Sequence, residues 1–274
     1  MSDDKLRLLV LGAHPDDAEV HAGGLMAMYR QLGHAVKIVS VTNGAAGHHQ
    51  RTPDELTEIR RGEAAAVARL IGAEYEIWEY PDGELQSTLE LRRRIIREIR
   101  GVAPDLVLTH RTNDYHPDHR AVGQAVQDAS FTVTVPLIVP DTTALRKDPL
   151  IAYMTDSFTK PNPLTADVVI DIEDQFETIV DMVHCHRSQV YEWLPYLDGT
   201  SDQVPQSEAS QREFLAQWLA TRFTSTADRF RQELIGTYGQ QHGSKVRFAE
   251  AYEISEYATK LDESNRDRLF PGSP

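Results

Sequence analysis

The chain has 274 residues, of which 41% are hydrophobic and 26% are charged, an ordinary globular balance that excludes extensive disorder. The formal net charge of -14 disfavours partners with a negative surface, either a nucleic-acid backbone or an anionic membrane. A single cysteine, Cys185, leaves no intramolecular disulfide, and no apolar run is long enough for a signal-peptide core or a membrane span, so we expect a cytoplasmic protein without a membrane anchor.

The first half of the chain alternates short apolar runs with helical patterns. Strands are expected over residues 6–12, 36–41, 75–79 and 106–109, and helices over 18–32, 53–71, 89–100 and 121–129. The helix over 53–71 has the clearest ends, with Thr52 as N-cap, Pro53 in the first turn and Gly72 after the last turn. This alternation predicts an α/β fold with a Rossmann-like, mostly parallel sheet and helices on both faces.

The second half of the chain has weaker patterns. Strands are expected over residues 151–154, 168–172 and 246–254, and helices over 175–191 and 213–233. A polar loop is expected over 197–210 and a frayed tail over 263–274. We therefore expect one domain over residues 1–274, with a core at about 5–135 and an irregular part at about 136–262 that walls the pocket.

Two segments that follow predicted strands carry unusual chemistry. HPDDAE, residues 14–19, contains one imidazole and three carboxylates, and HPDH, residues 116–119, contains two imidazoles and a carboxylate. In a parallel sheet the ligand crevice lies beyond the carboxyl ends of the strands. Catalytic zinc needs about three His or carboxylate ligands, and a further carboxylate serves as a general base. The alternative is that these residues only form turns and helix caps, but the presence of two such segments favours a metal site.

The two segments together also resemble a known family. AHPDDAEVHAGG at 13–24 followed by HPDH at 116–119 resembles the PIG-L/LmbE-like family of zinc-dependent N-deacetylases. Shorter matches follow the family's order along the chain: VTNG at 41–44, RRGEA at 60–64, PDG at 81–83, HRSQ at 186–189 and FAEA at 248–251. The resemblance implies a Zn2+ cofactor and hydrolysis of an N-acetyl or other N-acyl group on a small amino sugar, such as an N-acetylglucosamine derivative. It also implies a homo-oligomer, either a trimer or a hexamer.

The resemblance assigns roles by position in the motifs. The implied zinc ligands are His14, Asp17 and His119. Asp16 would take a proton from the attacking water. His116 would stabilise the oxyanion or protonate the leaving amine, with Asp118 holding the His116 imidazole.

Weaker assignments concern the shorter motifs. Arg60 and Asp82 are expected to bind substrate, although Arg60 also has Glu63 within ion-pair reach on the same helix and Pro-Asp-Gly is a common turn. The HRSQ segment looks like a fragment of a catalytic triad. Because it has no acid partner nearby in the sequence, we interpret it as part of the packing or the pocket wall.

Departures from the family leave the metal set intact and concern substrate choice. Leu25 follows the Gly-Gly pair where the family often has Thr, and residues 175–183 lack a lysine common there. Two alternatives stay open: an amidase that acts on a larger thiol-sugar conjugate, and a non-catalytic metal-binding protein. A dinucleotide-dependent oxidoreductase is disfavoured because GAHPDD lacks the required glycine spacing. The His/His/Asp set suits zinc, and iron fits the same ligands.

Overall fold

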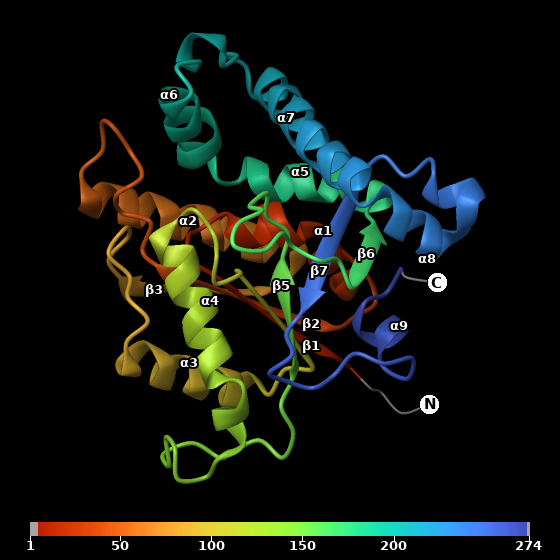
Figure 1. The fold of residues 1–274 in the computed structure, drawn as a ribbon. Helices are drawn as coiled ribbons and strands as arrows, with labels where there is room; N and C mark the ends of the chain where they lie inside the picture. The colour runs from red at the N-terminus through yellow and green to blue at the C-terminus, as the bar shows by residue number, and fades with distance from the viewer. Residues whose placement is uncertain (1–4, 273–274) are drawn as a thin grey trace.

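The computed structural model describes residues 5–272, and within this range seven strands form one sheet in the order β3-β2-β1-β4-β5-β7-β6 (Figure 1). The strands are β1 (Arg7–Gly12), β2 (Ala35–Thr42), β3 (Glu74–Tyr80), β4 (Leu106–Thr109), β5 (Leu150–Met154), β6 (Val168–Asp171) and β7 (Ala249–Ile254). The first five pair in parallel, whereas β7 runs antiparallel to both β5 and β6. The predicted α/β fold with a mostly parallel sheet is therefore confirmed.

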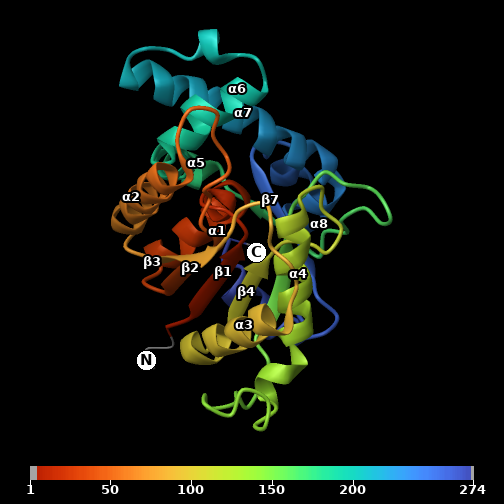
Figure 2. The ribbon, with the colours of Figure 1, turned by 90° about the vertical axis from the view of Figure 1, so that its left-hand side faces the viewer.

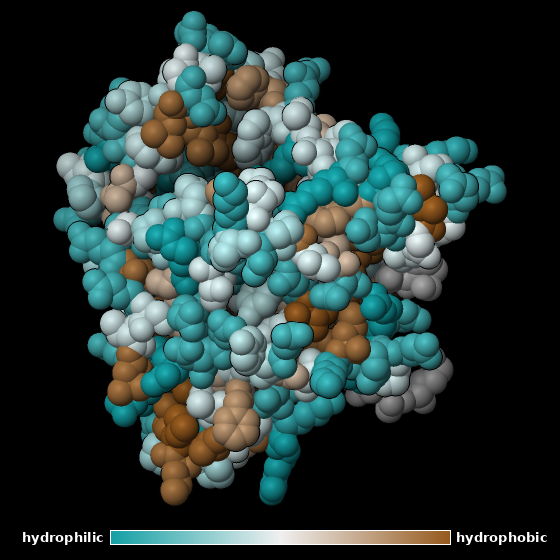
Figure 3. Space-filling view, in the orientation of Figure 1, coloured by the Kyte–Doolittle hydropathy of each residue, from teal (hydrophilic) through white to brown (hydrophobic). Residues whose placement is uncertain are grey.

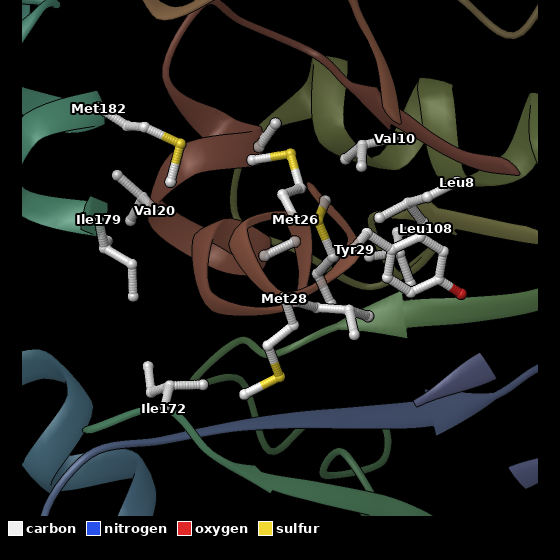
Figure 4. Packing of buried hydrophobic residues seen from close by; sticks show 14 of the residues in the cluster. Leu8, Val10, Val20, Met26, Met28, Tyr29, Leu108, Ile172, Ile179 and Met182 are labelled. Atoms are coloured by element: carbon white, nitrogen blue, oxygen red, sulfur yellow. The ribbon is translucent and has the colours of Figure 1, made fainter. Parts of the chain in front are cut away.

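Helices cover both faces of this sheet (Figure 2). One face carries α1 (Asp17–Gln31), α2 (Pro53–Ile71) and α5 (Phe176–His184), and the other carries α3 (Leu89–Val102) and α4 (Pro117–Ala129). Successive side chains of β1 divide between the two layers: Leu8 and Val10 join the core around α1, and Leu9 and Leu11 join the core under α3 and α4. Figure 4 shows Leu8 and Val10 in the first of these cores.

A break in α1 ties this helix to β7. Ala22 has non-helical angles (φ -145, ψ 15), so the helix restarts at the glycine pair. The freed backbone N–H groups of Gly24 and Leu25 donate to the carboxylate of Glu250, at 2.7 and 3.0 Å. A Cβ on Gly24 would lie 2.4 Å from Cγ2 of Ile172, so only glycine fits this close approach. The motif glycine is thus explained by packing.

The C-terminal part differs from the expectation in three places. The helix expected over 175–191 ends at His184 and is followed by a π-helical segment, η3 (Ser188–Trp193), and by α6 (Leu194–Leu197). The helix expected over 213–233 is two helices, α7 (Glu208–Arg229) and α8 (Arg231–Gly243), because the chain bends at the buried Phe230, which has no helical angles. The expected frayed tail contains α9 (Arg266–Leu269), and the buried side chains of Leu269 and Phe270 join the main core.

The remaining elements are short, and the surface is largely polar. Three 3-10 turns are present: η1 (Phe131–Thr134), η2 (Glu173–Gln175) and η4 (Ser201–Gln203). Figure 3 shows a largely hydrophilic face on which hydrophobic residues gather at the lower left, over the segment that follows α4 in Figure 1. Phe131 and Leu137 of that segment are 70% and 88% exposed. Across residues 5–272, every helix is too short or too polar to cross a lipid bilayer.

Candidate metal centre

The two motif segments meet at the carboxyl ends of β1 and β4, which are neighbours in the sheet. HPDD forms the turn between β1 and α1. α4 begins at Pro117, earlier than the expected residue 121, so His116 is its N-cap and Asp118 and His119 lie in its first turn. Gly123 holds α4 against the end of β4, because a Cβ there would lie 2.5 Å from the carbonyl oxygen of His110. Helix α4 thereby delivers His119 to the loop after β1.

Ligand atoms of three side chains from these segments form a compact triangle, to which each oxygen of Asp17 contributes one contact. Nδ1 of His14 lies 3.3 Å from Nε2 of His119 and 3.5 Å from Oδ2 of Asp17, and Nε2 of His119 lies 3.4 Å from Oδ1 of Asp17. Zinc–ligand bonds of 2.0–2.2 Å in a tetrahedron put neighbouring ligand atoms about 3.3–3.6 Å apart. The three contacts have the spacing of neighbouring ligands in a four-coordinate site. Overlapping groups of possible ligands meet here, namely His14/His116/His119, Asp17/His110/His119 and His14/Asp82/Asp118, so this His/Asp cluster has the donor types that bind a divalent metal.

Carboxylates contact the far nitrogens of both imidazoles. Nε2 of His14 lies 3.2 Å from Oδ2 of Asp118 and 3.2 Å from Oδ1 of Asp82. Nδ1 of His119 lies 3.1 Å from Oδ1 of Asp114. Metal-ligating histidines usually donate their second N–H to such a group, which fixes the ring. Asp118 thus contacts His14 where we expected His116, and Asp82 contacts His14 where we expected substrate, because the PDG turn lies directly behind the first motif.

The Asp17 carboxylate is held in its charged form. Its Oδ2 accepts hydrogen bonds from the backbone N–H groups of Ala13 and His14, at 2.9 and 2.7 Å. Burial raises the pKa of Asp17, but the neighbouring His119 and His110 outweigh burial and hold this pKa well below its usual range. A negatively charged, acceptor-only carboxylate at this position is the form that a metal requires.

The imidazoles of the triangle are strongly basic for the same reason. Burial lowers the pKa of His119, but Asp17 and Asp114 outweigh it and raise this pKa to about 9. Burial also lowers the pKa of His14, and hydrogen bonds to Asp118, Asp17 and Asp82 raise it well above its usual value. The carboxylates around the two facing imidazoles favour positive charge between them. A divalent cation would supply that charge in place of the two protons.

Asp16 has a different environment from the adjacent Asp17. Its backbone is in the left-handed region (φ 117), a strained conformation that separates the directions of the two side chains. Within residues 5–272 no donor hydrogen-bonds to the Asp16 carboxylate, which lines a cavity. Burial and the charge of Asp17 raise the pKa of Asp16 to about 6. A free carboxylate with a pKa close to neutrality can exchange a proton with a cavity water.

His116 lies on the other side of His14, with ring centroids 4.5 Å apart. As N-cap of α4, its Nδ1 accepts the backbone N–H of Asp118 at 3.2 Å. Burial, followed by the charges of His14 and His119, lowers the pKa of His116. The neutral ring therefore carries its proton on Nε2 and presents an N–H donor.

The weak motifs pair with one another behind the site. Nε2 of His186 lies 3.2 Å from Oε1 of Glu19, and both side chains are 0% exposed. Ser188 donates its backbone N–H and its hydroxyl to Glu63, at 2.7 and 2.8 Å. Three residues of the HRSQ segment, His186, Ser188 and Gln189, thus find their partners in motifs from the first quarter of the chain, whereas Arg187 donates to Gln211. Sequence spacing does not reveal these links.

Arg60 completes this network. Its guanidinium donates to the side chain of Gln189 and to the carbonyl oxygens of Pro15 and Gly47. The expected ion pair with Glu63 is therefore replaced, since Glu63 is bonded to Ser188. Arg60 is only 2% exposed, so it braces the loop that carries Asp16 and does not line the cavity where we expected it to contact substrate.

A cavity of about 640 Å3 opens over the triangle. His14, Asp16, Asp17 and His119 line one side. The rest of the lining comes from the segment after β5 and from one face of α7, including Thr155, Phe158, Trp218, Arg222, Ser225 and Arg229. A cavity of this size holds a ligand of several hundred daltons.

Sequence reasoning missed several residues of the site. Asp114, which contacts His119, lies two residues before the HPDH motif, and its proximity was the available signal. His110 stacks on His119 at 3.9 Å and places its Nε2 3.1 Å from Oδ2 of Asp17. As the first residue after β4, His110 was also available from its position. The α7 side of the cavity had no such signal.

The chain is similar to known proteins in sequence and in fold. Residues 9–130 match the model of the family described as PIG-L, GlcNAc-PI de-N-acetylase. Diacetylchitobiose deacetylase of Thermococcus kodakarensis is 27% identical over 206 residues, covering 71% of this chain and 76% of the relative. 4-oxalmesaconate hydratase of Pseudomonas putida is 24% identical over 204 residues, covering 72% and 79%. The solved structure of N,N'-diacetylchitobiose deacetylase from Pyrococcus horikoshii matches with a TM-score of 0.71 at 22% identity, covering 93% of this chain and 85% of that one, and shares the fold.

Proposed function

We propose that the chain is a member of the PIG-L/LmbE-like family and a metal-dependent hydrolase that removes an N-acetyl or related N-acyl group from an amino sugar. One observation carries the proposal: a His/His/Asp triangle of metal-ligand spacing lies beside a carboxylate without a hydrogen-bond donor, at the side of a ligand-sized cavity. Metal-dependent hydrolysis of an amide uses these two parts together.

The residues divide the chemistry among them. His14, Asp17 and His119 would hold the metal, which when bound supplies a Lewis acid that polarises the amide carbonyl and makes water more acidic. The Asp16 carboxylate accepts the proton of the attacking water, since it lines the cavity and is not a member of the triangle. The Nε2–H of His116 is available to stabilise the developing oxyanion or to protonate the leaving amine.

Several finer points belong to the same proposal. Zinc is the proposed metal because two imidazoles and one carboxylate suit it, although ferrous iron has compatible chemistry. We treat residues 1–274 as one functional domain, because strands from both halves share a sheet. The cytoplasmic location and the trimeric or hexameric assembly expected from the sequence stay predictions.

Two other reactions are compatible with the same centre. The larger-amide alternative is favoured by resemblance to a mycothiol S-conjugate amidase of Streptomyces coelicolor, which is 26% identical over 142 residues. The Pseudomonas putida relative is named as a hydratase, and a metal and a base can also activate water for addition to a double bond. The measured product distinguishes these reactions: a deacetylase releases acetate and an amine in equal amounts, whereas a hydratase releases neither.

The first experiment measures acetate and amine release from a panel of N-acetylated amino sugars. Purified protein is assayed as isolated, after chelation, and after zinc is restored. We expect release that chelation abolishes and zinc restores. If the protein binds zinc and releases nothing from any sugar or larger N-acyl conjugate, the proposed reaction is wrong. If it binds no divalent metal, the proposed centre is wrong.

A further inference from the structure

The cavity has a second polar wall that the proposed reaction does not use. Trp218, Arg222, Ser225 and Arg229 of α7 recur at intervals of four, three and four residues, so they lie on one face of the helix. All four line the same cavity as the metal triangle. The face combines two cations, a hydroxyl and an indole that is 41% exposed. It will be called the α7 wall.

Arg222 differs from Arg111, which also lies at this end of the sheet, in having no carboxylate partner. Arg111 forms a two-pronged pair with Asp156, at 2.5 and 2.6 Å, which neutralises it. Among the described residues of the chain, Arg222 forms no ion pair, and its polar contact is with the ring of His21. A half-buried guanidinium without an anion retains N–H donors and a full charge for a ligand.

His21 holds Arg222 without neutralising it. Nδ1 of His21 lies 2.9 Å from the carbonyl oxygen of Thr155, so this nitrogen carries the proton and donates it. Nη2 of Arg222 lies 3.0 Å from Nδ1 and 3.3 Å from Nε2 of this ring, and of the two nitrogens Nε2 is then the one that can accept from it. Burial, followed by the charge of Arg222, lowers the pKa of His21 well below its usual value, which keeps the ring neutral. The imidazole therefore positions the guanidinium and leaves its charge intact.

Arg229 reinforces the positive charge of the α7 wall. Its guanidinium donates to the carbonyl oxygens of Asp156 and Leu164, which fix its place without cancelling its charge. The same cavity carries the carboxylates of Asp16, Asp17 and Asp114. Burial lowers the pKa of the Arg222 guanidinium, and these carboxylates partly offset that lowering. A negatively charged group of a ligand is repelled from these carboxylates and attracted to the α7 wall.

We propose that the α7 wall binds an anionic group of the substrate, a carboxylate or a phosphate, and that Arg222 is the specificity-determining residue for it. This inference rests on the proposed function and names the substrate class more closely: an N-acyl amino sugar that carries an anion, its amide at the metal triangle and its anion at Arg222. A cavity of about 640 Å3 accommodates both groups of one ligand.

The test compares neutral and anionic substrates in matched variants. N-acetylglucosamine is the neutral probe, N-acetylmuramic acid carries a carboxylate, and the 1- and 6-phosphates of N-acetylglucosamine carry a phosphate. Arg222→Met removes the charge and keeps the stem, and Arg222→Lys restores a point charge. Arg212→Met is the control, because Arg212 lies on the same helix but pairs with Asp181 and Glu177 outside the cavity.

Kinetics and binding are both measured, with binding followed by calorimetry in zinc-loaded protein carrying Asp16→Asn to prevent turnover. We expect Arg222→Met to raise KM and Kd for the anionic probe that fits by about 10- to 100-fold, the value of a hydrogen bond to a charged group. Values for N-acetylglucosamine should stay within twofold, Arg222→Lys should recover part of the loss, and Arg212→Met should match the parent protein. Whether the muramic acid or a phosphate responds identifies the anion.

Two results would overturn the inference while leaving the proposed function intact: amine release from all probes with no effect of Arg222→Met, or an equal loss for neutral and anionic probes. The converse result is also distinguishable. If an anionic probe binds in an Arg222-dependent manner but no probe releases an amine from the zinc-loaded parent protein, the α7 wall stands and the proposed reaction fails.

Discussion

Nε2 of His14 lies 3.2 Å from Oδ2 of Asp118, although the two residues are 104 positions apart. The same carboxylate accepts the backbone N–H groups of Gly83 and Leu85, at 2.7 and 3.1 Å. Asp118 therefore joins the turn after β1, the turn after β3 and the first turn of α4. Because its contact fixes the far nitrogen of the His14 ring, it also determines where the near nitrogen, Nδ1, points.

Replacing Asp118 by Asn should weaken metal binding without removing a ligand of the triangle. The amide cannot accept from both backbone N–H groups and from His14 as the carboxylate does, so the imidazole loses its fixed orientation. We expect a 10- to 100-fold loss of zinc affinity, roughly the effect of such partners elsewhere, measured by competition with a chromogenic chelator. Asp128→Asn, on the exposed side of the same helix, is the control and should bind zinc as the parent does. Unchanged affinity in Asp118→Asn would refute the orienting role.

Replacing Asp16 by Asn should have the opposite pattern: zinc retained and turnover lost. Asn tolerates the left-handed backbone of residue 16 better than Ala and cannot accept a proton at neutral pH. We expect kcat to fall about 100- to 10,000-fold, the usual contribution of a general base. Metal content by atomic emission and deacetylation rate are measured on the same preparation. A full zinc complement with parental turnover would exclude Asp16 as the base.

The helix with the clearest capping residues in the sequence was predicted with the correct bounds. The bounds of α2 agree with the prediction because Thr52 and Glu55 form a capping box and Gly72 ends the helix in the left-handed region. The start of α4 was missed, although Pro117 occupies the same first-turn position as Pro53, because His-Pro-Asp also fits a turn. A helix start and a turn differ here only in how the segment packs against His110, which lies behind it in the fold.

Long-range pairings could not be predicted in the same way. The acid partner of His186 is Glu19, a residue that the sequence places in the first motif and the fold places under the second half of the chain. The residue types of the α7 wall are ordinary for a protein surface. They line the cavity only because α7 packs on α5 and extends over the end of the sheet. Local patterns in a single sequence do not indicate which distant residues come into contact. Pairings that depend on tertiary packing therefore could not be predicted.

The Glu19–His186 pair gives a stability prediction. Both side chains are fully buried, with 3.2 Å between Oε1 of Glu19 and Nε2 of His186. Burial lowers the pKa of His186, but the charges of Glu19 and Asp16 outweigh burial and raise it. Removing one partner strands the other, so Glu19→Leu should lower the free energy of unfolding by about 3 kcal/mol or more. Replacing both residues by Leu should recover part of this loss, because apolar packing can replace a buried pair.

Denaturant unfolding of the single and double variants measures this coupling. Glu58→Gln, which removes an exposed partner of Arg61, is the control and should change stability by less than about 1 kcal/mol. If the free energy of unfolding of the double variant falls by the sum of the two single losses, the residues are not coupled, and their contact contributes nothing to stability.

Glu250 gives a prediction for the pH dependence of stability. Burial raises the pKa of this carboxyl to about 7, despite the hydrogen bonds from Tyr252, Gly24 and Leu25. Its pKa in the unfolded chain is close to 4.3. Between these two values the folded protein binds more protons than the unfolded chain, so the contribution of Glu250 is most favourable below pH 4 and declines as pH rises to about 7.

Glu250→Gln should remove this dependence, because the amide resembles the protonated acid and does not ionise. Relative to the parent protein, the variant should have similar stability near pH 5 and should be more stable at pH 8, by up to about 3 kcal/mol. Subtracting the two urea-unfolding free energies at each pH cancels the other titrating groups that both proteins share. A difference that stays constant from pH 5 to 8 would mean that Glu250 is ionised throughout, stabilised by the two N–H groups at the restart of α1, and that the hydrogen bonds outweigh its burial.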